Sequence, residues 1–329
     1  MKHATCLADL GLENVQHILG TAKAWKLQPH QKHLRDKLLG MIFFNPSLRT
    51  RVSFESVMAR GGGTAIVMEA GAGIWQLEDR IGAVMDGDRP EHLKEAVPVL
   101  SRFVDALAVR AFAGGTNDDA DHEDPILRAF RDYATVPVLS MEGAREHPCQ
   151  GLADLLTIEE QFGPTRALPV TLTWAPHIKP LPKAVPNSFL LTAAARGCDI
   201  RVAHPSGFEL HPEILREAQA YADASGGKVS FFSEQETALR GARVVYAKAW
   251  GPATAAGLAP EVVRQHDDWM ITPRQMEAAG ADAIFLHCLP VRRNLEVADA
   301  VLDGKWSRVV DQAENRFHVQ RALLDWLLH

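Results

Sequence analysis

A short polar segment that follows an apolar run has the composition of an anion site. Residues 44–51 read Phe-Asn-Pro-Ser-Leu-Arg-Thr-Arg, and a helical pattern of apolar residues comes after them. The first turn of a helix carries N–H groups without intrahelical partners and the positive end of the helix dipole, and both attract anions. We expect the anion to lie against four consecutive residues, Ser47, Leu48, Arg49 and Thr50. An ordinary capping serine with solvated arginines is the alternative.

Two further polar clusters follow predicted strands. Arg110 lies near the end of the apolar strand 106–112, where its permanent charge requires either a bound anion or a carboxylate partner. His147 and Gln150 follow the strand 136–141 and open a helix whose first turn contains a proline. Residues three apart on a helix share one face, so this pair can donate hydrogen bonds to a carbonyl oxygen. A histidine at a helix start can also be a simple cap or core group.

The last cluster is His287-Cys-Leu-Pro290, which follows the apolar strand residues Ala283–Leu286 and precedes two arginines. His-Cys can bind metals, but no matching ligand group is spaced nearby, so we expect no metal and no cofactor. Arg316, which comes just after a predicted short strand at 308–311, can serve a ligand at the same place.

Strand-like runs alternate with amphipathic stretches along the whole chain, which predicts an α/β fold with parallel sheets covered on both faces. A break near 142–150 divides them into domains 1–145 and 146–313, and a final helix 314–329 is free to join the first. The predicted strands are 38–44, 64–69, 106–112, 136–141, 169–175, 199–204, 229–232, 243–249, 283–288 and 308–311. The predicted helices are 50–60, 90–104, 123–133, 150–162, 183–196, 211–224, 293–302 and 314–328.

Composition narrows the class of protein. The 329 residues favour two domains, and 47% hydrophobic with 23% charged residues is ordinary for a soluble globular protein. The formal charge of −6 argues against a nucleic-acid partner. Apolar runs are too short to span a membrane, and the N-terminus has no signal-peptide core. The four cysteines are scattered without a CxxC pair, which favours a reduced, cytoplasmic protein.

Together the motifs Ser47-Leu-Arg-Thr-Arg51, His147-Pro-Cys-Gln150 and His287-Cys-Leu-Pro290 resemble the signature of the aspartate/ornithine carbamoyltransferase superfamily. The resemblance runs from about residue 38 to the end of the chain. It implies two doubly wound parallel-sheet domains, the first binding carbamoyl phosphate and the second binding the amine substrate. It also implies a homotrimer with shared active sites, in which Trp75 reaches in from an adjacent subunit.

Other segments resemble the branch of this superfamily that acts on N-acetylornithine or N-succinylornithine. In that branch the position of Pro90 looks like the selector, where glutamate goes with the acetyl substrate and proline with the succinyl one. A glutamate would repel the extra carboxylate of a succinyl group, whereas proline leaves room and no charge. Pro90 can equally be a good first residue of the helix 90–104. The resemblance favours N-succinylornithine, with N-acetylornithine as the alternative, and a role in arginine biosynthesis.

The resemblance also implies the site residues. The catalytic set is Arg49, Thr50, Arg110, His147, Gln150, Cys288 and Arg316. Carbamoyl phosphate would be bound by these and by Ser47, Leu48, Trp75 and Leu289. The acylornithine set is Pro90, Glu142, His177, Lys248, Leu289 and Arg292, with His177, Lys248 and Arg292 as the basic groups for the α-carboxylate and the succinyl carboxylate. Glu296 stands where some acetyl-specific relatives carry a modifiable lysine.

Two rival functions come from other classes. The first is a ligand-binding homologue that kept the fold without turnover, which the intact catalytic set disfavours. The second is a nucleotide-dependent dehydrogenase on a similar sheet. No GxGxxG follows a strand, and Gly61-Gly-Gly63 ends a predicted helix instead of starting one.

Overall fold

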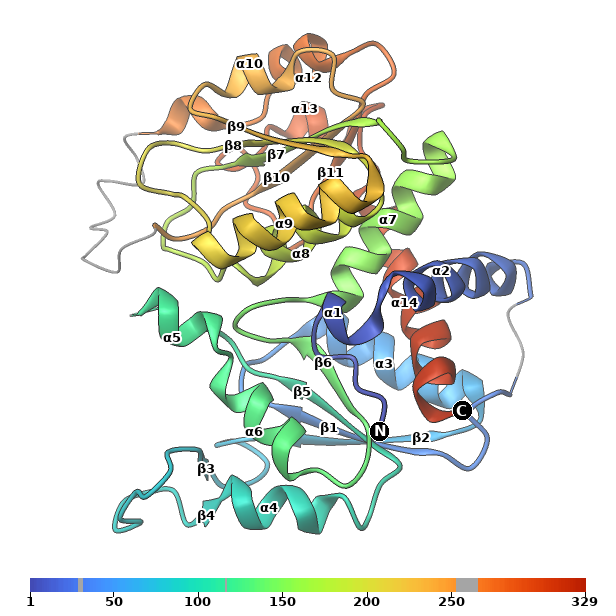
Figure 1. Ribbon diagram of the computed structural model, residues 1–329, viewed down its shortest axis with the longest axis vertical. Helices are drawn as coiled ribbons and strands as arrows, with labels where there is room; N and C mark the ends of the chain where they lie inside the picture. Colours follow the sequence, from blue (N-terminus) through green and yellow to red (C-terminus); the bar gives the residue numbers. More distant parts are fainter. Residues whose placement is uncertain (29–31, 116, 253–265) are drawn as a thin grey trace. The chain divides into compact units, whose positions relative to one another are not determined.

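The computed structural model describes residues 1–28, 32–115, 117–252 and 266–329, and these form two compact units (Figure 1). The first unit comprises residues 1–113, 120–149 and 316–329, and the second comprises 114–119 and 150–315. Each unit is built on its own parallel sheet, which confirms the predicted α/β fold with two parallel-sheet domains.

The sheet of the first unit has the strand order β2-β1-β5-β6. Its strands are β1 (Leu38–Phe43), β2 (Thr64–Glu69), β5 (Ala106–Arg110) and β6 (Val138–Glu142). The chain passes from β1 to β2 on one side and then places β5 on the other side of β1. The order therefore reverses between β1 and β5, and open α/β sheets bind ligands beyond the carboxyl ends of strands at such a switch point.

Helices cover both faces of this sheet (Figure 1). The packed apolar side chains of α4 (Leu93–Leu100) and α6 (Pro125–Tyr133) form one core cluster with those of the strands. The other helices with residues in the first unit are α1 (Leu7–Leu10), α2 (Leu12–Lys26), α3 (Leu48–Gly61), and parts of α5 (Asp118–His122), α7 (Pro148–Phe162) and α14 (Val309–Leu328). A small parallel ladder joins β3 (Leu77–Glu78) to β4 (Glu91–His92).

The sheet of the second unit has the order β11-β10-β7-β8-β9, and its own switch point lies between β7 and β10. The strands are β7 (Pro169–Trp174), β8 (Asp199–Ala203), β9 (Lys228–Phe232), β10 (Val244–Lys248) and β11 (Ile284–Leu286). One face carries α8 (Ala184–Ala195) and α9 (Pro212–Ser225), and the other carries α10 (Gln235–Leu239), α12 (Pro273–Ala279) and α13 (Asp299–Leu302) (Figure 1). A 3-10 turn, η1 (Asp267–Trp269), precedes α12.

One predicted element is wrong, and two predicted helices are shorter than expected. Residues 308–311 start α14 instead of forming a strand, because the pairing with β11 is a single bridge from Phe285 to Ser307, after which the apolar helical pattern takes over. The helix predicted at 293–302 is confined to α13, since Asn294 has a positive φ and binds the Asp299 backbone. The helix predicted at 90–104 begins only at Leu93.

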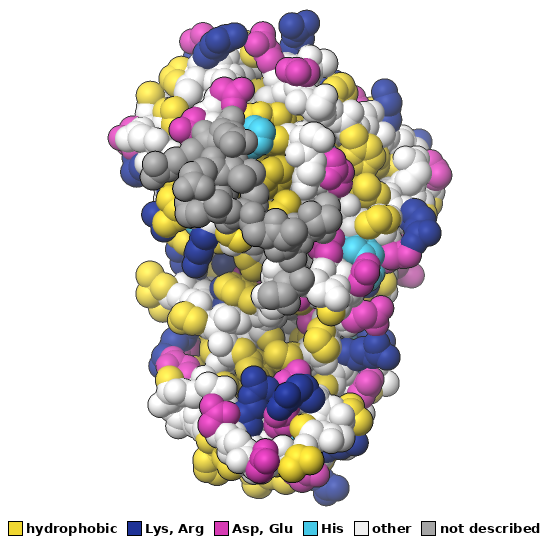
Figure 2. All heavy atoms as spheres, turned by 90° about the vertical axis from the view of Figure 1, so that its left-hand side faces the viewer, with side chains coloured by type: hydrophobic (Ala, Val, Ile, Leu, Met, Phe, Trp, Pro, Cys, Tyr) yellow, Lys and Arg dark blue, Asp and Glu magenta, His cyan; other side chains and the backbone are white. Residues whose placement is uncertain are grey.

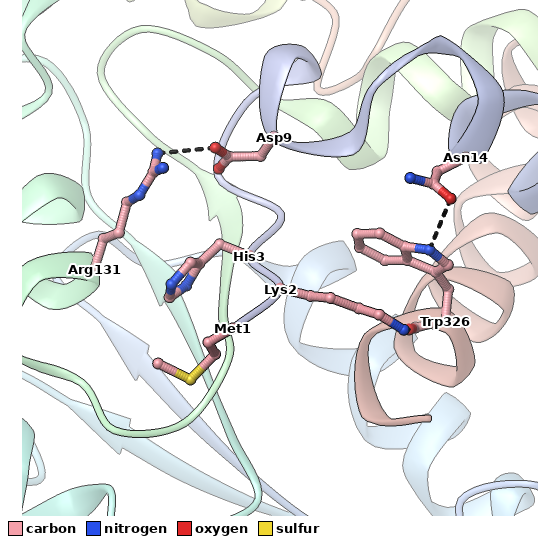
Figure 3. Close-up of a pocket in the computed structure, with 7 residues that line it drawn as sticks. All are labelled: Met1, Lys2, His3, Asp9, Asn14, Arg131 and Trp326. Atoms are coloured by element: carbon pink, nitrogen blue, oxygen red, sulfur yellow. Dashed lines mark hydrogen bonds and ion pairs between the residues drawn. The ribbon is translucent and has the colours of Figure 1, made fainter.

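The N-terminal segment is fixed to α14 and α6 within the first unit (Figure 3). Lys2 Nζ donates to the Trp326 carbonyl at 3.0 Å, and Asn14 Oδ1 accepts from the Trp326 indole at 3.2 Å. Arg131 pairs with Asp9 at 2.8 Å. On the face shown in Figure 2, acidic and basic side chains are interspersed with apolar ones. None of the helices in the described part of the chain is long and apolar enough to cross a membrane.

Candidate active site

The switch point of the first unit gathers residues from the start of α3 and from α14. Thr50 is fully buried in the first turn of α3, and its hydroxyl accepts a 2.8 Å hydrogen bond from Arg316 Nη2. These residues are 266 positions apart in sequence, so only the return of α14 to the first unit joins them. Arg316 lies inside this helix, not after a strand as the sequence suggested.

A second pair lies at the ends of the adjacent strands β5 and β6. Arg110 Nη1 binds Glu142 Oε2 at 2.5 Å, and the Arg110 guanidinium stacks on Phe112 with a 4.5 Å separation from the ring centroid. A register shift between Val109 and Arg110 sets Glu142 opposite Arg110, and Glu142 takes a φ of 150°. Such bulges re-aim side chains near functional sites. Of the two partners that the sequence allowed for Arg110, a bound anion or a carboxylate, the structure thus contains a carboxylate, that of Glu142.

His147 completes this cluster. Its side chain is buried, and its Nε2 lies 3.9 Å from Glu142 Oε2. Burial, reinforced by Arg316 and Arg110, holds the pKa of His147 well below its ordinary value. The imidazole is therefore neutral near pH 7 and offers one N–H donor, which suits a carbonyl oxygen on which negative charge develops.

Positive charge is concentrated in this cluster. Burial lowers the pKa of Arg316, while Cys149 and Glu142 raise it and the neighbouring Arg110 and Arg49 lower it further. Three guanidiniums thus lie close enough to influence one another, with Glu142 as the carboxylate among them. Like charges held together in a buried place favour a bound anion.

The start of α3 also shows the capping arrangement that the sequence left open. Ser47 has an extended backbone, and its Oγ accepts from the Thr50 N–H at 3.3 Å. This bond occupies one of the four N–H groups expected to face an anion. The Leu48 side chain is 76% exposed and contributes to the expected site only through its backbone.

The turn that leads from Glu142 to His147 is held by a buried carboxylate. Asp124 accepts a hydrogen bond from the Arg145 N–H at 3.2 Å. A Cβ added at Gly143 would lie 2.1 Å from Asp124 Oδ2, so only glycine permits this approach. Burial raises the pKa of Asp124 from 3.8 to about 6, although backbone N–H groups of this turn oppose the shift.

Asp124 therefore makes stability depend on pH. A carboxyl whose pKa is raised by folding contributes stability below its unfolded pKa of 3.8, and this is lost as the pH rises through about 6. In the wild type we expect the free energy of unfolding to fall by about 3 kcal/mol between pH 4 and pH 7 because of Asp124. The Asp124→Asn variant should not show this fall. Urea unfolding at several pH values measures it. Asp132→Asn, at an exposed carboxylate of α6, is the control that should keep the wild-type slope; an unchanged slope in Asp124→Asn would contradict the prediction.

The switch point of the second unit brings together three predicted acylornithine ligands. His177 follows β7, and Lys248 ends β10 with its Nζ donating to the Ala249 carbonyl at 2.9 Å. Arg292 Nε donates to His177 Nε2 at 3.0 Å. The Nδ1 of His177 lies 2.8 Å from the Lys179 carbonyl, so it carries the proton and the ring is neutral. Burial also lowers the pKa of His177. His177 Nε2 therefore accepts from Arg292 in this structure, and a direct role of His177 on a carboxylate stays a prediction.

Glu296 adds a carboxylate to this group. Its Oε2 accepts from the Arg292 N–H at 2.6 Å, and its Oε1 lies 3.5 Å from His287 Nε2. Burial opposes its charge, but His287 and Lys248 outweigh burial and hold the pKa of Glu296 below its ordinary value. An ionised Glu296 thus supplies negative charge beside Lys248.

A network that the sequence analysis did not identify surrounds Gln150. Gln150 Nε2 donates to Asp154 Oδ1 at 2.7 Å, and Gln312 Nε2 donates to the same oxygen at 2.6 Å. Gln312 Oε1 accepts from the His287 N–H at 2.9 Å, which ties α7 to the start of the His-Cys-Leu-Pro segment. The spacing of four between Gln150 and Asp154 was a signal for the first bond. No local signal in the sequence indicated the bond from Gln312, since Gln312 lies 158 residues from Asp154.

The His287-Cys-Leu-Pro290 segment is a tight turn after β11. The Leu289 N–H donates to His287 Nδ1 at 2.9 Å, Leu289 has a φ of 56°, and its peptide bond to Pro290 is cis. Burial raises the pKa of Tyr246 well above its ordinary value, and the buried Cys288 lies close enough to the Tyr246 hydroxyl to add to this rise.

Trp75 and Pro90 lie in a separate surface segment around the β3–β4 ladder. The Trp75 side chain is 58% exposed, and its indole N–H donates to Glu91 Oε2 at 2.7 Å. Pro90 is exposed and directly precedes β4. His92, not Pro90, caps α4, since its Nδ1 accepts from the Lys94 N–H at 3.0 Å. The alternative of Pro90 as first helical residue is therefore wrong.

Comparison with known proteins covers nearly the whole chain. Residues 2–160 match the carbamoyl-P binding domain of aspartate/ornithine carbamoyltransferase, and residues 182–327 match its Asp/Orn binding domain. The chain belongs to the aspartate/ornithine carbamoyltransferase family. Members of this family are enzymes, so the chain is a carbamoyltransferase.

Two curated members of the family are similar over most of their length. N-succinylornithine carbamoyltransferase of Bacteroides thetaiotaomicron is 40% identical over 320 residues, which is 96% of this chain and 95% of the relative. N-acetylornithine carbamoyltransferase of Xanthomonas campestris pv. campestris is 38% identical over 330 residues, covering 98% of this chain and 97% of the relative.

Solved structures of family members have the same fold. A glutamate-to-proline variant of N-acetyl-L-ornithine transcarbamylase, complexed with carbamyl phosphate and N-succinyl-L-norvaline, superposes with a TM-score of 0.96. It is 37% identical, and the match covers 99% of this chain and 100% of that one. Acetylornithine transcarbamylase complexed with acetylcitrulline gives the same TM-score and identity, with 99% of both chains covered.

Proposed function

We propose that this carbamoyltransferase transfers the carbamoyl group of carbamoyl phosphate to the side-chain amine of N-succinyl-L-ornithine. The products are N-succinyl-L-citrulline and phosphate, as a step of arginine biosynthesis. The observation that carries the transfer chemistry is the cluster of Arg49, Thr50, Arg110, His147 and Arg316 at the switch point of the first unit. Neighbouring guanidiniums and a helix N-terminus suit a dianionic phosphate.

In the proposed reaction the phosphate lies at the start of α3, beside Ser47, Leu48 and Arg49. Arg49, Arg316 and the helix dipole would balance its charge. Arg110, Thr50 and neutral His147 would donate to the carbamoyl oxygen. These donors would stabilise the charge that grows on this oxygen as the amine nitrogen attacks the carbamoyl carbon. The carbon–oxygen bond to phosphate then breaks, and the departing phosphate takes the proton from the amine. No protein base is then required.

The amine end of the carbamoyl group needs acceptors. We assign this role to the Gln150 oxygen and to the carbonyls of Cys288 and Leu289. Gln150 was expected to donate, but one of its amide N–H groups is already bound to Asp154. The Cys288 thiol would orient the attacking amine.

Acylornithine would be held by residues at the switch point of the second unit. Lys248 and Arg292 are its cations for carboxylates, with His177 orienting Arg292. Glu296, which His287 and Lys248 keep ionised, would supply negative charge here, which supports the idea that a carboxylate replaces a modified lysine. Glu142 is the proposed acceptor for the acyl amide N–H, although in this structure it pairs with Arg110.

Two observations favour the succinyl substrate. Pro90 puts no charge where a glutamate would repel a second carboxylate. The glutamate-to-proline variant of the similar acetylornithine enzyme was solved with a succinyl compound. N-acetylornithine stays the second candidate, because relatives with that name are nearly as similar as those named for the succinyl substrate.

We further propose a cytoplasmic homotrimer in which Trp75 serves the site of a neighbouring subunit. The exposed apolar side chains around the β3–β4 ladder support this, since Ile81 is 67% and Val84 is 80% exposed beside Trp75. The part of the chain that the structure describes contains no disulfide, which suits a reducing compartment. Sedimentation analysis of the wild type and of Trp75→Ala tests the assembly.

Steady-state assays with three amines test the substrate. We expect citrulline-forming turnover of N-succinylornithine to exceed that of N-acetylornithine by at least about tenfold in kcat/KM, because one added carboxylate can gain a charged hydrogen bond. Ornithine should be poor, since its free α-amine is charged. A clear preference for N-acetylornithine would establish the second candidate instead, and turnover of ornithine alone would overturn both.

A further inference from the structure

The buried network around Asp154 fixes the direction of the Gln150 amide. A carboxylate oxygen accepts hydrogen bonds and cannot donate them, and Asp154 Oδ1 lies 2.7 Å from Gln150. If the amide turned over, its carbonyl oxygen would face the carboxylate oxygen at contact distance, which is repulsive. Gln150 therefore keeps its nitrogen on Asp154 and directs its oxygen the other way.

The Gln150 oxygen is buried and has no hydrogen-bond partner among the residues that the structure describes. Gln150 is 1% exposed and Asp154 is fully buried, so water does not offer an easy substitute. A buried acceptor without a partner costs free energy until a donor arrives. The atom is thus suited to a ligand that carries an N–H group.

The same carboxylate fixes a second amide. Gln312 also gives its nitrogen to Asp154 Oδ1, at 2.6 Å, and its oxygen consequently receives the His287 N–H. Asp154 therefore has one effect on both glutamines, since each turns its oxygen away from the carboxylate. Its position on α7, one turn after Gln150, makes this arrangement part of the helix.

We propose that Asp154 is a positioning residue that makes the enzyme selective for carbamoyl over acyl phosphates. By holding the Gln150 oxygen toward the ligand, it provides an acceptor for the carbamoyl N–H that a methyl group in the same place cannot satisfy. The proposal rests on the proposed function, in which Gln150 contacts the carbamoyl group. Sites that hydrogen-bond a substrate N–H reject analogues that lack it, because their polar groups are left unpaired.

Two stable phosphonates isolate this interaction. Phosphonoacetamide and acetonylphosphonate differ only in an amide NH2 against a methyl group, and neither transfers a group. We expect the wild type to bind phosphonoacetamide about tenfold more tightly in calorimetry, the value of one neutral hydrogen bond to a buried acceptor. In Asp154→Asn the new amide can accept or donate a hydrogen bond, so the Gln150 amide can adopt either direction. The ratio of phosphonoacetamide affinity to acetonylphosphonate affinity should then fall toward one, while the affinity for acetonylphosphonate itself is retained.

Thr157→Val is the matched control. Thr157 is fully buried one turn along α7, where it binds the Ala153 carbonyl at 2.7 Å and the Asn315 side chain at 3.0 Å. The Thr157→Val variant should lose about as much stability as Asp154→Asn but keep the wild-type ratio of the two phosphonate affinities. If Asp154→Asn does not fold, Asp154→Ser leaves a hydroxyl that also permits either amide direction, and the same loss is expected.

The outcomes separate the two proposals. An undiminished ratio in a folded Asp154 variant would overturn the positioning role while leaving the transferase intact. A wild type that binds both phosphonates equally would show that Gln150 does not receive the carbamoyl N–H. A wild type that binds neither, and turns over no carbamoyl phosphate, would overturn the proposed function and this inference with it.

Discussion

Arg110→Ala is expected to lower kcat by about 10²–10³-fold, the loss that follows removal of one preorganised donor to a developing oxyanion. Arg110 is buried at the carboxyl end of β5, where it cannot shed its charge, and it influences both His147 and Arg316. Its loss removes a cation from the proposed phosphate site and frees Glu142 to repel the ligand. Steady-state assays with saturating carbamoyl phosphate measure the effect.

Stability must be separated from chemistry in this test, because the variant leaves the Glu142 carboxylate without its guanidinium. Arg110→Lys keeps a charge for Glu142 but lacks the planar fork, so it should fold well and still lose most of its turnover. Arg131→Ala is the matched control, since Arg131 is also an arginine in an ion pair, here with Asp9 of the N-terminal segment (Figure 3). Near-normal kcat in both Arg110 variants would exclude the guanidinium from the transfer step.

Local patterns were sufficient for the elements that position the site. The apolar run that forms β1 is followed by a serine whose side chain caps α3, and both features lie within a few residues of each other. The proline after His147 likewise marked the start of α7. Such features depend on neighbouring residues, which is why the sequence predicted them well.

Partners of the site residues could not be predicted in this way. Glu142 meets Arg110 because β6 lies beside β5 with a register shift, and neither fact is written in the local sequence. Arg292 and His177 are 115 residues apart and pair because both lie at the switch point of the second unit. The helix start at Leu93 was missed because Pro90 is an equally good helix starter, while the capping bond from His92 decided the boundary.

A shared logic connects the two clusters. In each unit the reversal of strand order leaves room beyond two strand ends, and charged side chains are placed there. The first unit presents mainly guanidiniums, which suit phosphate. The second mixes Lys248 and Arg292 with Glu296, so its net charge is smaller and better matched to a zwitterion-like substrate with carboxylates and an amine.

Pro90→Glu is expected to reverse the acyl preference, lowering the succinyl-to-acetyl ratio of kcat/KM by about 10²-fold or more, since like charges brought together at a binding site cost several kcal/mol. The added carboxylate would lie beside Glu91 in the surface segment that carries Trp75. Because Pro90 is outside α4, its replacement does not remove a helix residue. Initial rates with both substrates at matched carbamoyl phosphate measure the ratio.

Pro90→Ala separates charge from backbone stiffness. Alanine removes the ring but adds no charge, so the succinyl preference should survive if repulsion is the selector, and should fall if the fixed backbone of proline matters more. Pro90→Gln has nearly the shape of glutamate without its charge, and we expect it to fall between the two. A ratio unchanged in Pro90→Glu would mean that the succinyl carboxylate lies away from this position, and Arg292→Ala would then be the variant to locate it.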